Sequence, residues 1–132
     1  DYATALQAIL NGSYLAGVID EMETVRTAPP IAIGSVNSAL VNNGFDYRYA
    51  LGHWRECADA TWNVSCEDRH VSSSTGAFGW HPWIDFDNGY YGVLAVFEVT
   101  INGRSAAEAS VAFSQEIQPL IVSALADLRA GQ

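Results

Sequence analysis

The chain has 132 residues, 49% of them hydrophobic and 16% charged, which is typical of a globular domain rather than a disordered chain. Its 6 basic residues are all arginine and stand against 15 acidic ones, a net charge of −9 that would repel a phosphate backbone. We therefore expect no nucleic-acid partner. No apolar run approaches the roughly 20 residues of a membrane span, so we expect no membrane partner either. Because the chain has no lysine, any mechanism that needs a lysine must take it from another chain.

Helical spacing of apolar residues marks the start of the chain. Residues 2–10 are predicted to form a helix that stops at Asn11-Gly12. A second helix is predicted over 20–27, because acidic residues at its start suit the positive end of the helix dipole. The following segment, 28–44, is predicted to be irregular because it is rich in Ala, Gly, Ser and Asn.

Short aromatic and β-branched runs between turn residues then indicate strands. Four are predicted, at 47–56, 62–71, 76–85 and 90–100. Asn88-Gly89 separates the last two, and because both residues tolerate the backbone angles of a tight turn, these strands should be antiparallel neighbours.

A long C-terminal helix is predicted over 105–130. Ser105 and Glu108 have the spacing of a capping box, and Pro119 is expected to kink the helix. The helix is expected to pack across the sheet, and its apolar pattern is Val111, Phe113, Ile117, Leu120, Ile121, Leu125 and Leu128.

The predicted fold class is α+β: an antiparallel sheet of about four strands, short N-terminal helices, and a C-terminal helix packed on the sheet. We expect 1–132 to be a single domain or fragment. It comprises a helical and irregular lead-in (1–44), the sheet (45–104) and the C-terminal helix (105–130).

Cys57 and Cys66 are the two cysteines, in a stretch that the pattern predicts to be two strands joined by a polar turn. A hairpin disulfide is expected, and it would favour a periplasmic or secreted location. His53 and His70 extend the pair to a His-x3-Cys-x8-Cys-x3-His array, which invites a zinc interpretation. Residues four apart on a strand lie about 13 Å apart, too far to share one ion. We therefore expect no metal site and no cofactor.

The run 71–85 (VSSSTGAFGWHPWID), with 89–95 (GYYGVLA) after it, resembles the closing strands of class C β-lactamase-like and penicillin-binding-protein-like serine hydrolases. In that family a strand carrying Lys-Thr-Gly or His-x-Gly leads into a glycine-aromatic-glycine hairpin and an Ile-Asp strand end. The segment 49–54 (YALGHW) is similar to the family's Tyr-Gly-Leu-Gly-Trp strand. The opening, 2–17, is similar to the helix and loop that precede that strand.

The resemblance implies that the Lys-Thr-Gly strand falls on Val71-Ser72-Ser73, or one residue earlier from His70. It also implies that the backbone N–H of Ser74 supplies half of an oxyanion hole. Oxyanion or substrate-binding candidates are Ser72, Ser73, Ser74, His70 and His81. The three serines would line a substrate cleft at a strand edge, although consecutive serines are also ordinary turn residues.

The nucleophile in Ser-x-x-Lys and the Tyr-x-Asn element are not found in this sequence. By the resemblance they would lie on a missing N-terminal part or on a second chain. A self-contained triad of Ser72 to Ser74, His81 and Asp85 is possible in residue types, but no nucleophile-elbow pattern surrounds these serines.

Two functions stay open. The first is the C-terminal portion of a serine hydrolase for a small ester, amide or β-lactam substrate, which supplies the cleft strand and is inactive alone. The alternative is a stand-alone module that binds a small ligand or has a structural role and self-associates as a homodimer.

Overall fold

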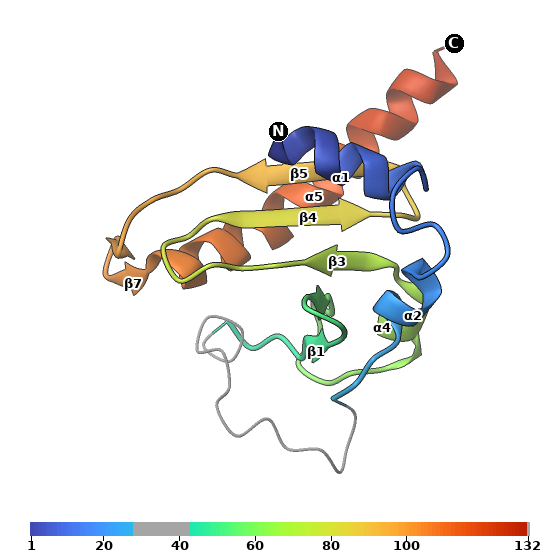
Figure 1. The fold of residues 1–132 in the computed structure, drawn as a ribbon. Coiled ribbons are helices and arrows are strands. Elements are labelled where there is room, and N and C mark those ends of the chain that lie inside the picture. Colours follow the sequence, from blue (N-terminus) through green and yellow to red (C-terminus); the bar gives the residue numbers. More distant parts are fainter. Residues whose placement is uncertain (28–42, 132) are drawn as a thin grey trace.

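Five antiparallel strands form one sheet in the computed structural model, which describes residues 1–27 and 43–131 (Figure 1). The strands follow chain order across the sheet: β1 (Arg48–Tyr49), β2 (Trp54–Arg55), β3 (Val71–Ser73), β4 (His81–Asp85) and β5 (Tyr90–Leu94). A separate ribbon pairs β6 (Thr100–Ile101) with β7 (Arg104–Ser105). The helices are α1 (Tyr2–Leu10), α2 (Ile19–Glu23), α4 (Val64–Asp68) and α5 (Ala106–Ala130). The predicted α+β class is confirmed, with one more strand in the sheet than expected.

Three of the four predicted strands are shorter than the sequence pattern indicates. The segment 47–56 is a hairpin of β1 and β2, which turns through Gly52 at a φ of +80°. The segment 76–85 is extended only from His81, because Gly76 donates its N–H to the Trp80 carbonyl and closes a turn first. The β4–β5 pair is antiparallel around Asn88-Gly89, as predicted.

The predicted strand at 62–71 is wrong, because its centre is the helix α4. The side chain of Asn63 accepts hydrogen bonds from the N–H groups of Ser65 and Cys66, at 2.9 and 3.3 Å, and so caps the first turn. Extended backbone resumes only at Val71, in β3. The N-terminal helix at 2–10 is confirmed, whereas the second helix ends at Glu23 rather than at residue 27. Most of the predicted irregular segment, residues 28–42, lies outside the described residues.

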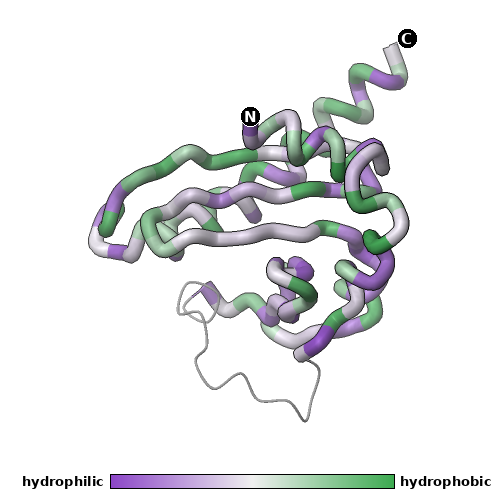
Figure 2. Tube along the Cα trace, in the orientation of Figure 1, coloured by the Kyte–Doolittle hydropathy of each residue, from purple (hydrophilic) through white to green (hydrophobic). Residues whose placement is uncertain are grey.

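The predicted last strand, 90–100, ends at Leu94, and the chain that follows it is apolar and exposed. Phe97 is 84% exposed, and Val99 is exposed as well. Figure 2 shows the hydrophobic character of this stretch beyond β5. The Phe97 ring lies 5.3 Å from the ring of Phe78, in the loop between β3 and β4. The two loops therefore form one apolar surface at the end of the sheet.

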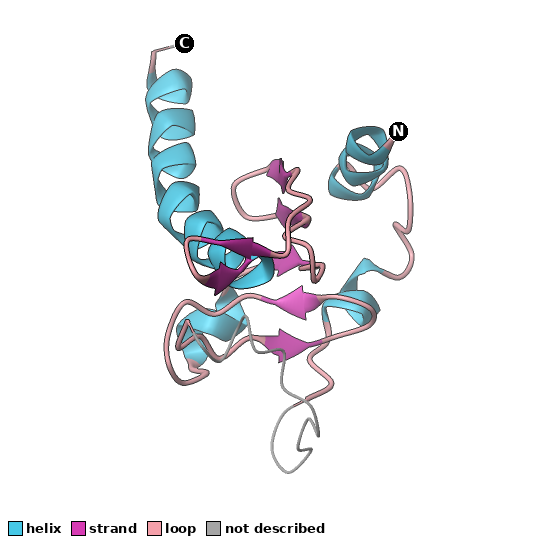
Figure 3. Cartoon of the chain, turned by 90° about the vertical axis from the view of Figure 1, so that its left-hand side faces the viewer, coloured by secondary structure: helices cyan, strands magenta, loops and turns pink. Residues whose placement is uncertain are grey.

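Helices cover the two faces of the sheet (Figure 3). On one face α1 contacts β4 and β5, with Leu6 buried beneath it. On the other face α5 packs through its N-terminal half, where Ala107 and Val111 join Tyr47 in the core. Within residues 1–27 and 43–131, no helix combines the length and the apolar character needed to cross a membrane.

The capping box that begins α5 is confirmed: Glu108 N–H donates to Ser105 Oγ, and Ser105 N–H donates to Glu108 Oε2. The helix packs on the sheet as predicted, through its N-terminal half. Leu120 is 69% exposed and Leu128 is also exposed, because the C-terminal half of α5 extends past the sheet (Figure 1). Pro119 lies within the continuous helix.

Candidate functional site

A cavity of about 190 Å³ lies against the face of the sheet that α1 covers. Four separate parts of the chain form its walls: α1, α2, the β1–β2 turn, and the strands β3 and β4 with the loop between them. The lining residues include Tyr2, Leu6 and Ile9 of α1, Met22 and Glu23 of α2, Leu51, Gly52 and His53 of the turn, and Ser72, Ser73, Ser74 and Pro82. All of these parts except α2 belong to the segments that carry the resemblance to serine hydrolases. The walls are mainly apolar, so the serines and His53 place a few polar groups in a hydrophobic pocket.

Glu23, a carboxylate that the sequence analysis did not single out, contacts the polar side chains of this cavity. Ser72 Oγ donates to Glu23 Oε1 at 2.6 Å, and His53 Nε2 lies 3.1 Å from the same oxygen. The other carboxylate oxygen lies 3.1 Å from Arg55 Nε. Glu23 comes from α2, which is 49 residues from Ser72 along the chain, so no local pattern could join the two.

Burial alone would raise the pKa of Glu23. The hydrogen bonds from His53 and Ser72, with the nearby Arg55 charge, outweigh burial and hold that pKa below its usual value. Glu23 is therefore ionised at neutral pH and accepts from the serine. His53 contacts the carboxylate rather than the Ser72 hydroxyl, so these three groups do not form a serine-histidine-acid relay.

The expected position of the serines at a strand edge is wrong, because β3 is the third of five strands. Ser73 pairs with Trp54 on one side and with Trp83 on the other. The Ser74 N–H, which the resemblance places in an oxyanion hole, donates to the Pro82 carbonyl at 3.1 Å. That donor is therefore part of the β3–β4 pairing.

The two histidine candidates lie away from the serine cavity. His70 donates its N–H to Asp87 Oδ2 at 2.8 Å, and its Nδ1 lies 2.9 Å from Asp87 Oδ1. Burial raises the pKa of Asp87, but the hydrogen bonds from His70 outweigh this effect and lower it. His81 is fully buried on the opposite face of the sheet, which α5 covers. Of the five candidates, only the three serines line one cavity, and the side chain of Ser73 points to the opposite face of the sheet from that of Ser72.

His81 belongs to a second cluster of polar side chains. Its Nδ1 lies 2.7 Å from Thr75 Oγ1, and its Nε2 faces Glu56 Oε1 at 3.9 Å. The triad with Ser72 to Ser74 and Asp85, which was possible in residue types alone, does not form, because Asp85 accepts from the N–H and side-chain amide of Asn88 in the hairpin turn. Burial lowers the pKa of His81, partly offset by the charge of Glu56, so the imidazole is neutral at neutral pH.

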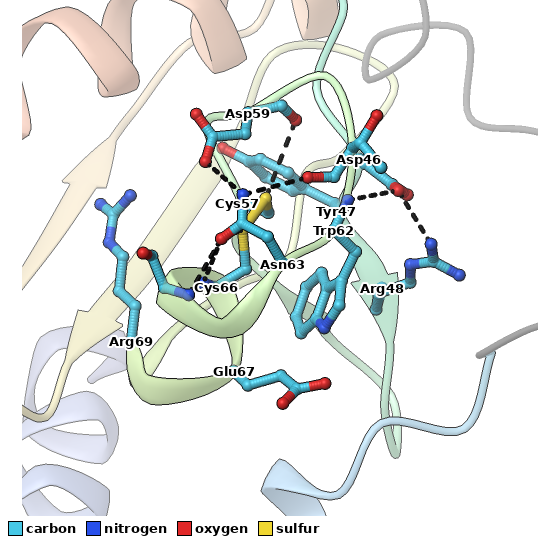
Figure 4. Close-up of a disulfide and its surroundings, with 12 residues drawn as sticks. Asp46, Tyr47, Arg48, Cys57, Asp59, Trp62, Asn63, Cys66, Glu67 and Arg69 are labelled. Atoms are coloured by element: carbon cyan, nitrogen blue, oxygen red, sulfur yellow. Dashed lines mark hydrogen bonds and ion pairs between the residues drawn. A yellow bond between two sulfur atoms is a disulfide. The ribbon is translucent and has the colours of Figure 1, made fainter.

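Cys57 and Cys66 form a disulfide with a Cα–Cα distance of 5.1 Å (Figure 4). It joins the end of β2 to α4, and so it is not the hairpin bridge between two strands that the sequence predicted. The Asp59 carboxylate and both sulfurs lie within 4.8 Å of one another, but the sulfurs are bonded to each other and offer no thiolate. His53 and His70, the other members of the zinc array, are engaged with Glu23 and Asp87.

The sequence analysis did not identify Glu23, Glu56 or Thr75. Glu23 and Glu56 contact residues far away in the sequence, and Thr75 contacts His81 across a turn. A weak signal was present for Thr75, because it lies six residues from His81 in a predicted turn.

Comparison with protein-family models, curated proteins and solved structures finds no match for this chain.

Proposed function

We propose that this chain is the C-terminal portion of a β-lactamase-like serine hydrolase acting on an ester or amide, and that by itself it does not catalyse steady-state turnover. One observation carries the proposal. The three segments that resemble the family lie far apart in sequence, yet they line a single cavity. Their convergence on one pocket is what a shared role in substrate binding requires.

The chemistry that this wall offers is binding rather than bond breaking. Glu23 holds the Ser72 hydroxyl, and apolar side chains surround it. The chain has no lysine, so the lysine base that the resemblance implies would come from another segment. A cavity of about 190 Å³ is smaller than the roughly 300–1,000 Å³ of pockets that enclose a whole ligand. It would hold one part of the substrate, and the missing part of the enzyme would hold the rest.

A self-associating module remains the second candidate, because of the apolar surface at the end of the sheet. Phe78, Phe97 and Val99 are all exposed there. Exposed apolar patches of this kind mark protein–protein contacts. A second copy of the chain would cover this surface in a homodimer, whereas the missing N-terminal part would cover it in a complete hydrolase.

Hydrolysis of a chromogenic ester and a β-lactam tests the proposal. The chain should show no steady-state turnover alone. It should show turnover when joined to an N-terminal region from its gene that carries Ser-x-x-Lys, and lose it when that serine is replaced by alanine. In the joined protein, Ser72→Ala should lower kcat/KM, whereas the control Ser123→Ala on the exposed side of α5 should not.

Steady-state turnover by the chain alone would contradict the proposal, as would a joined protein that stays inactive. The mass of the chain in solution distinguishes the self-associating module from the hydrolase portion. A stable dimer whose gene encodes no Ser-x-x-Lys region would favour the self-associating module.

A further inference from the structure

A hydroxyl, an imidazole and a carboxylate lie in series on the face of the sheet that α5 covers. Thr75 Oγ1 is 2.7 Å from His81 Nδ1, and His81 Nε2 is 3.9 Å from Glu56 Oε1. This order is the one that nucleophilic catalysis requires: a nucleophile within hydrogen-bond reach of a base, and a third group facing the other side of the base.

The hydrogen bonds that Glu56 makes to α5 leave one of its two carboxylate oxygens available to His81. Glu56 Oε2 accepts from the side-chain amides of Gln115 and Gln118 on α5, at 2.7 and 3.0 Å. Glu56 Oε1 and His81 Nε2 are both buried, and neither has a hydrogen-bond partner among residues 1–27 and 43–131. The two atoms lie 3.9 Å apart, and a shift of about 1 Å would bring them to the usual hydrogen-bond distance.

The carboxylate favours one tautomer of the imidazole. Because Glu56 Oε1 faces Nε2, a ring proton is favoured on Nε2, which leaves Nδ1 to accept a hydrogen bond from Thr75 Oγ1. His81 is then a neutral base poised against a hydroxyl, and its deep burial keeps it neutral.

We propose that Thr75 is a nucleophile activated by His81, with Glu56 as the positioning carboxylate, and that it accepts an acyl group from an activated ester. Thr75 Oγ1 attacks the ester carbonyl carbon as its proton passes to His81 Nδ1, and Glu56 stabilises the resulting imidazolium. The C–O bond to the alcohol then breaks, and the proton leaves with the alkoxide. The products are an acyl-Thr75 ester and a free alcohol.

A cavity lined by the residues that follow Thr75 indicates which acyl groups fit. Thr75 is partly exposed, in the loop between β3 and β4. A cavity of about 450 Å³ begins at the next residue, and its lining includes Gly76, Phe78, Trp80, Val96 and Phe97. These walls are apolar, so the geometry favours an ester with a hydrocarbon acyl chain over one with a charged acyl group. This activity goes beyond the proposed function, in which the nucleophile lies on another segment.

The experiment mixes the 132-residue chain with p-nitrophenyl butyrate and records p-nitrophenolate release. We expect a burst of about one equivalent per chain, followed by no comparable turnover, and a butyryl group on Thr75 by peptide mass spectrometry. Thr75→Val should abolish the burst and Thr75→Ser should retain it. His81→Gln should slow it by about 100-fold or more, the range that general-base catalysis contributes. The control Thr100→Val, at an exposed threonine on β6, should leave it unchanged.

Glu56→Gln tests whether the Glu56 carboxylate positions the His81 imidazole. It should slow the burst while Thr75 remains the labelled residue, and Glu56→Asp should recover part of the rate. If His81→Gln fails to fold by circular dichroism, the Thr75→Val and Thr75→Ser pair decides alone. A label on another residue, the absence of a burst, or a burst that Thr75→Val leaves intact would overturn the proposal. None of these results bears on turnover by the joined hydrolase, so the two proposals fail independently.

Discussion

Replacing Gly92 by alanine tests a close packing contact between two strands of the sheet. Gly92 on β5 pairs with Trp83 on β4, and the indole lies across the glycine. A Cβ at this position would lie 2.1 Å from Trp83 Cζ2 and 2.4 Å from Cη2. Such distances are far inside van der Waals contact, so the ring or the strand must move.

The size of the effect follows from how little room the ring has. Trp83 is 3% exposed, and the His81 ring lies 5.8 Å from it on the same face of the sheet. Overpacking a tight core costs about 1–3 kcal/mol, and a rigid aromatic ring cannot yield as a flexible side chain does. We therefore expect Gly92→Ala to lower the free energy of unfolding by about 3 kcal/mol, roughly a 150-fold change in the unfolding equilibrium.

Urea denaturation followed by tryptophan fluorescence and circular dichroism measures this change. Trp83→Phe removes the ring atoms nearest to the added methyl group. In the Trp83→Phe background, Gly92→Ala should therefore cost at least about 1 kcal/mol less than it does alone. Gly17→Ala is the matched control, since no atom lies within 4 Å of its added Cβ. Equal costs for Gly92→Ala and Gly17→Ala, or strictly additive effects of the Gly92 and Trp83 substitutions, would refute the reasoning.

Three further predictions concern the disulfide, the buried histidine and the helix cap. Replacing Cys57 and Cys66 by serine should lower the free energy of unfolding by about 2.6 kcal/mol, the loop-closure value for a separation of 9 residues; a loss below about 1 kcal/mol in urea denaturation would contradict it. Because burial lowers the pKa of His81, the unfolded chain binds more protons below the ordinary histidine pKa of about 6.5. The stability due to His81 is thus complete above about pH 6.5 and is lost as the pH falls through the lower folded value, so His81→Gln should flatten the urea midpoint against pH below about 6.5. Ser105→Ala should cost about 1 kcal/mol and Ser105→Thr much less, because threonine keeps the hydroxyl that caps α5; equal losses by thermal unfolding would argue against the cap.

Local signals in the sequence identified the elements whose ends are determined by neighbouring residues. The capping box at Ser105 and Glu108 and the Asn88-Gly89 turn each act within a few residues, and both are present in the structure. The strand predicted at 62–71 failed for a related reason. Its β-branched and aromatic residues outweighed a local cap at Asn63, which begins α4. The Asn63 side chain was visible in the sequence, so this error was avoidable.

The polar clusters could not be predicted in the same way, because their members meet only after folding. Glu23 reaches Ser72 from a helix 49 residues earlier, and Glu56 is held by glutamines 59 and 62 residues later. Hydrophobic periodicity shows which face of an element is buried, but it does not show which buried carboxylate meets which hydroxyl. The exposure of the second half of α5 could not be predicted either, since its apolar spacing continues beyond the point where the sheet ends.

Strand geometry keeps the two clusters apart. Successive side chains on a strand point to opposite faces, so Ser72 faces the side of α1 while its neighbour Ser73 faces away from it. His81 and Trp83 share the α5 face of β4 for the same reason. A ligand in the serine cavity would therefore contact Glu23 and His53, with the sheet between it and His81. The binding wall and the proposed acyl acceptor are thus separate features of one sheet, and loss of one need not entail loss of the other.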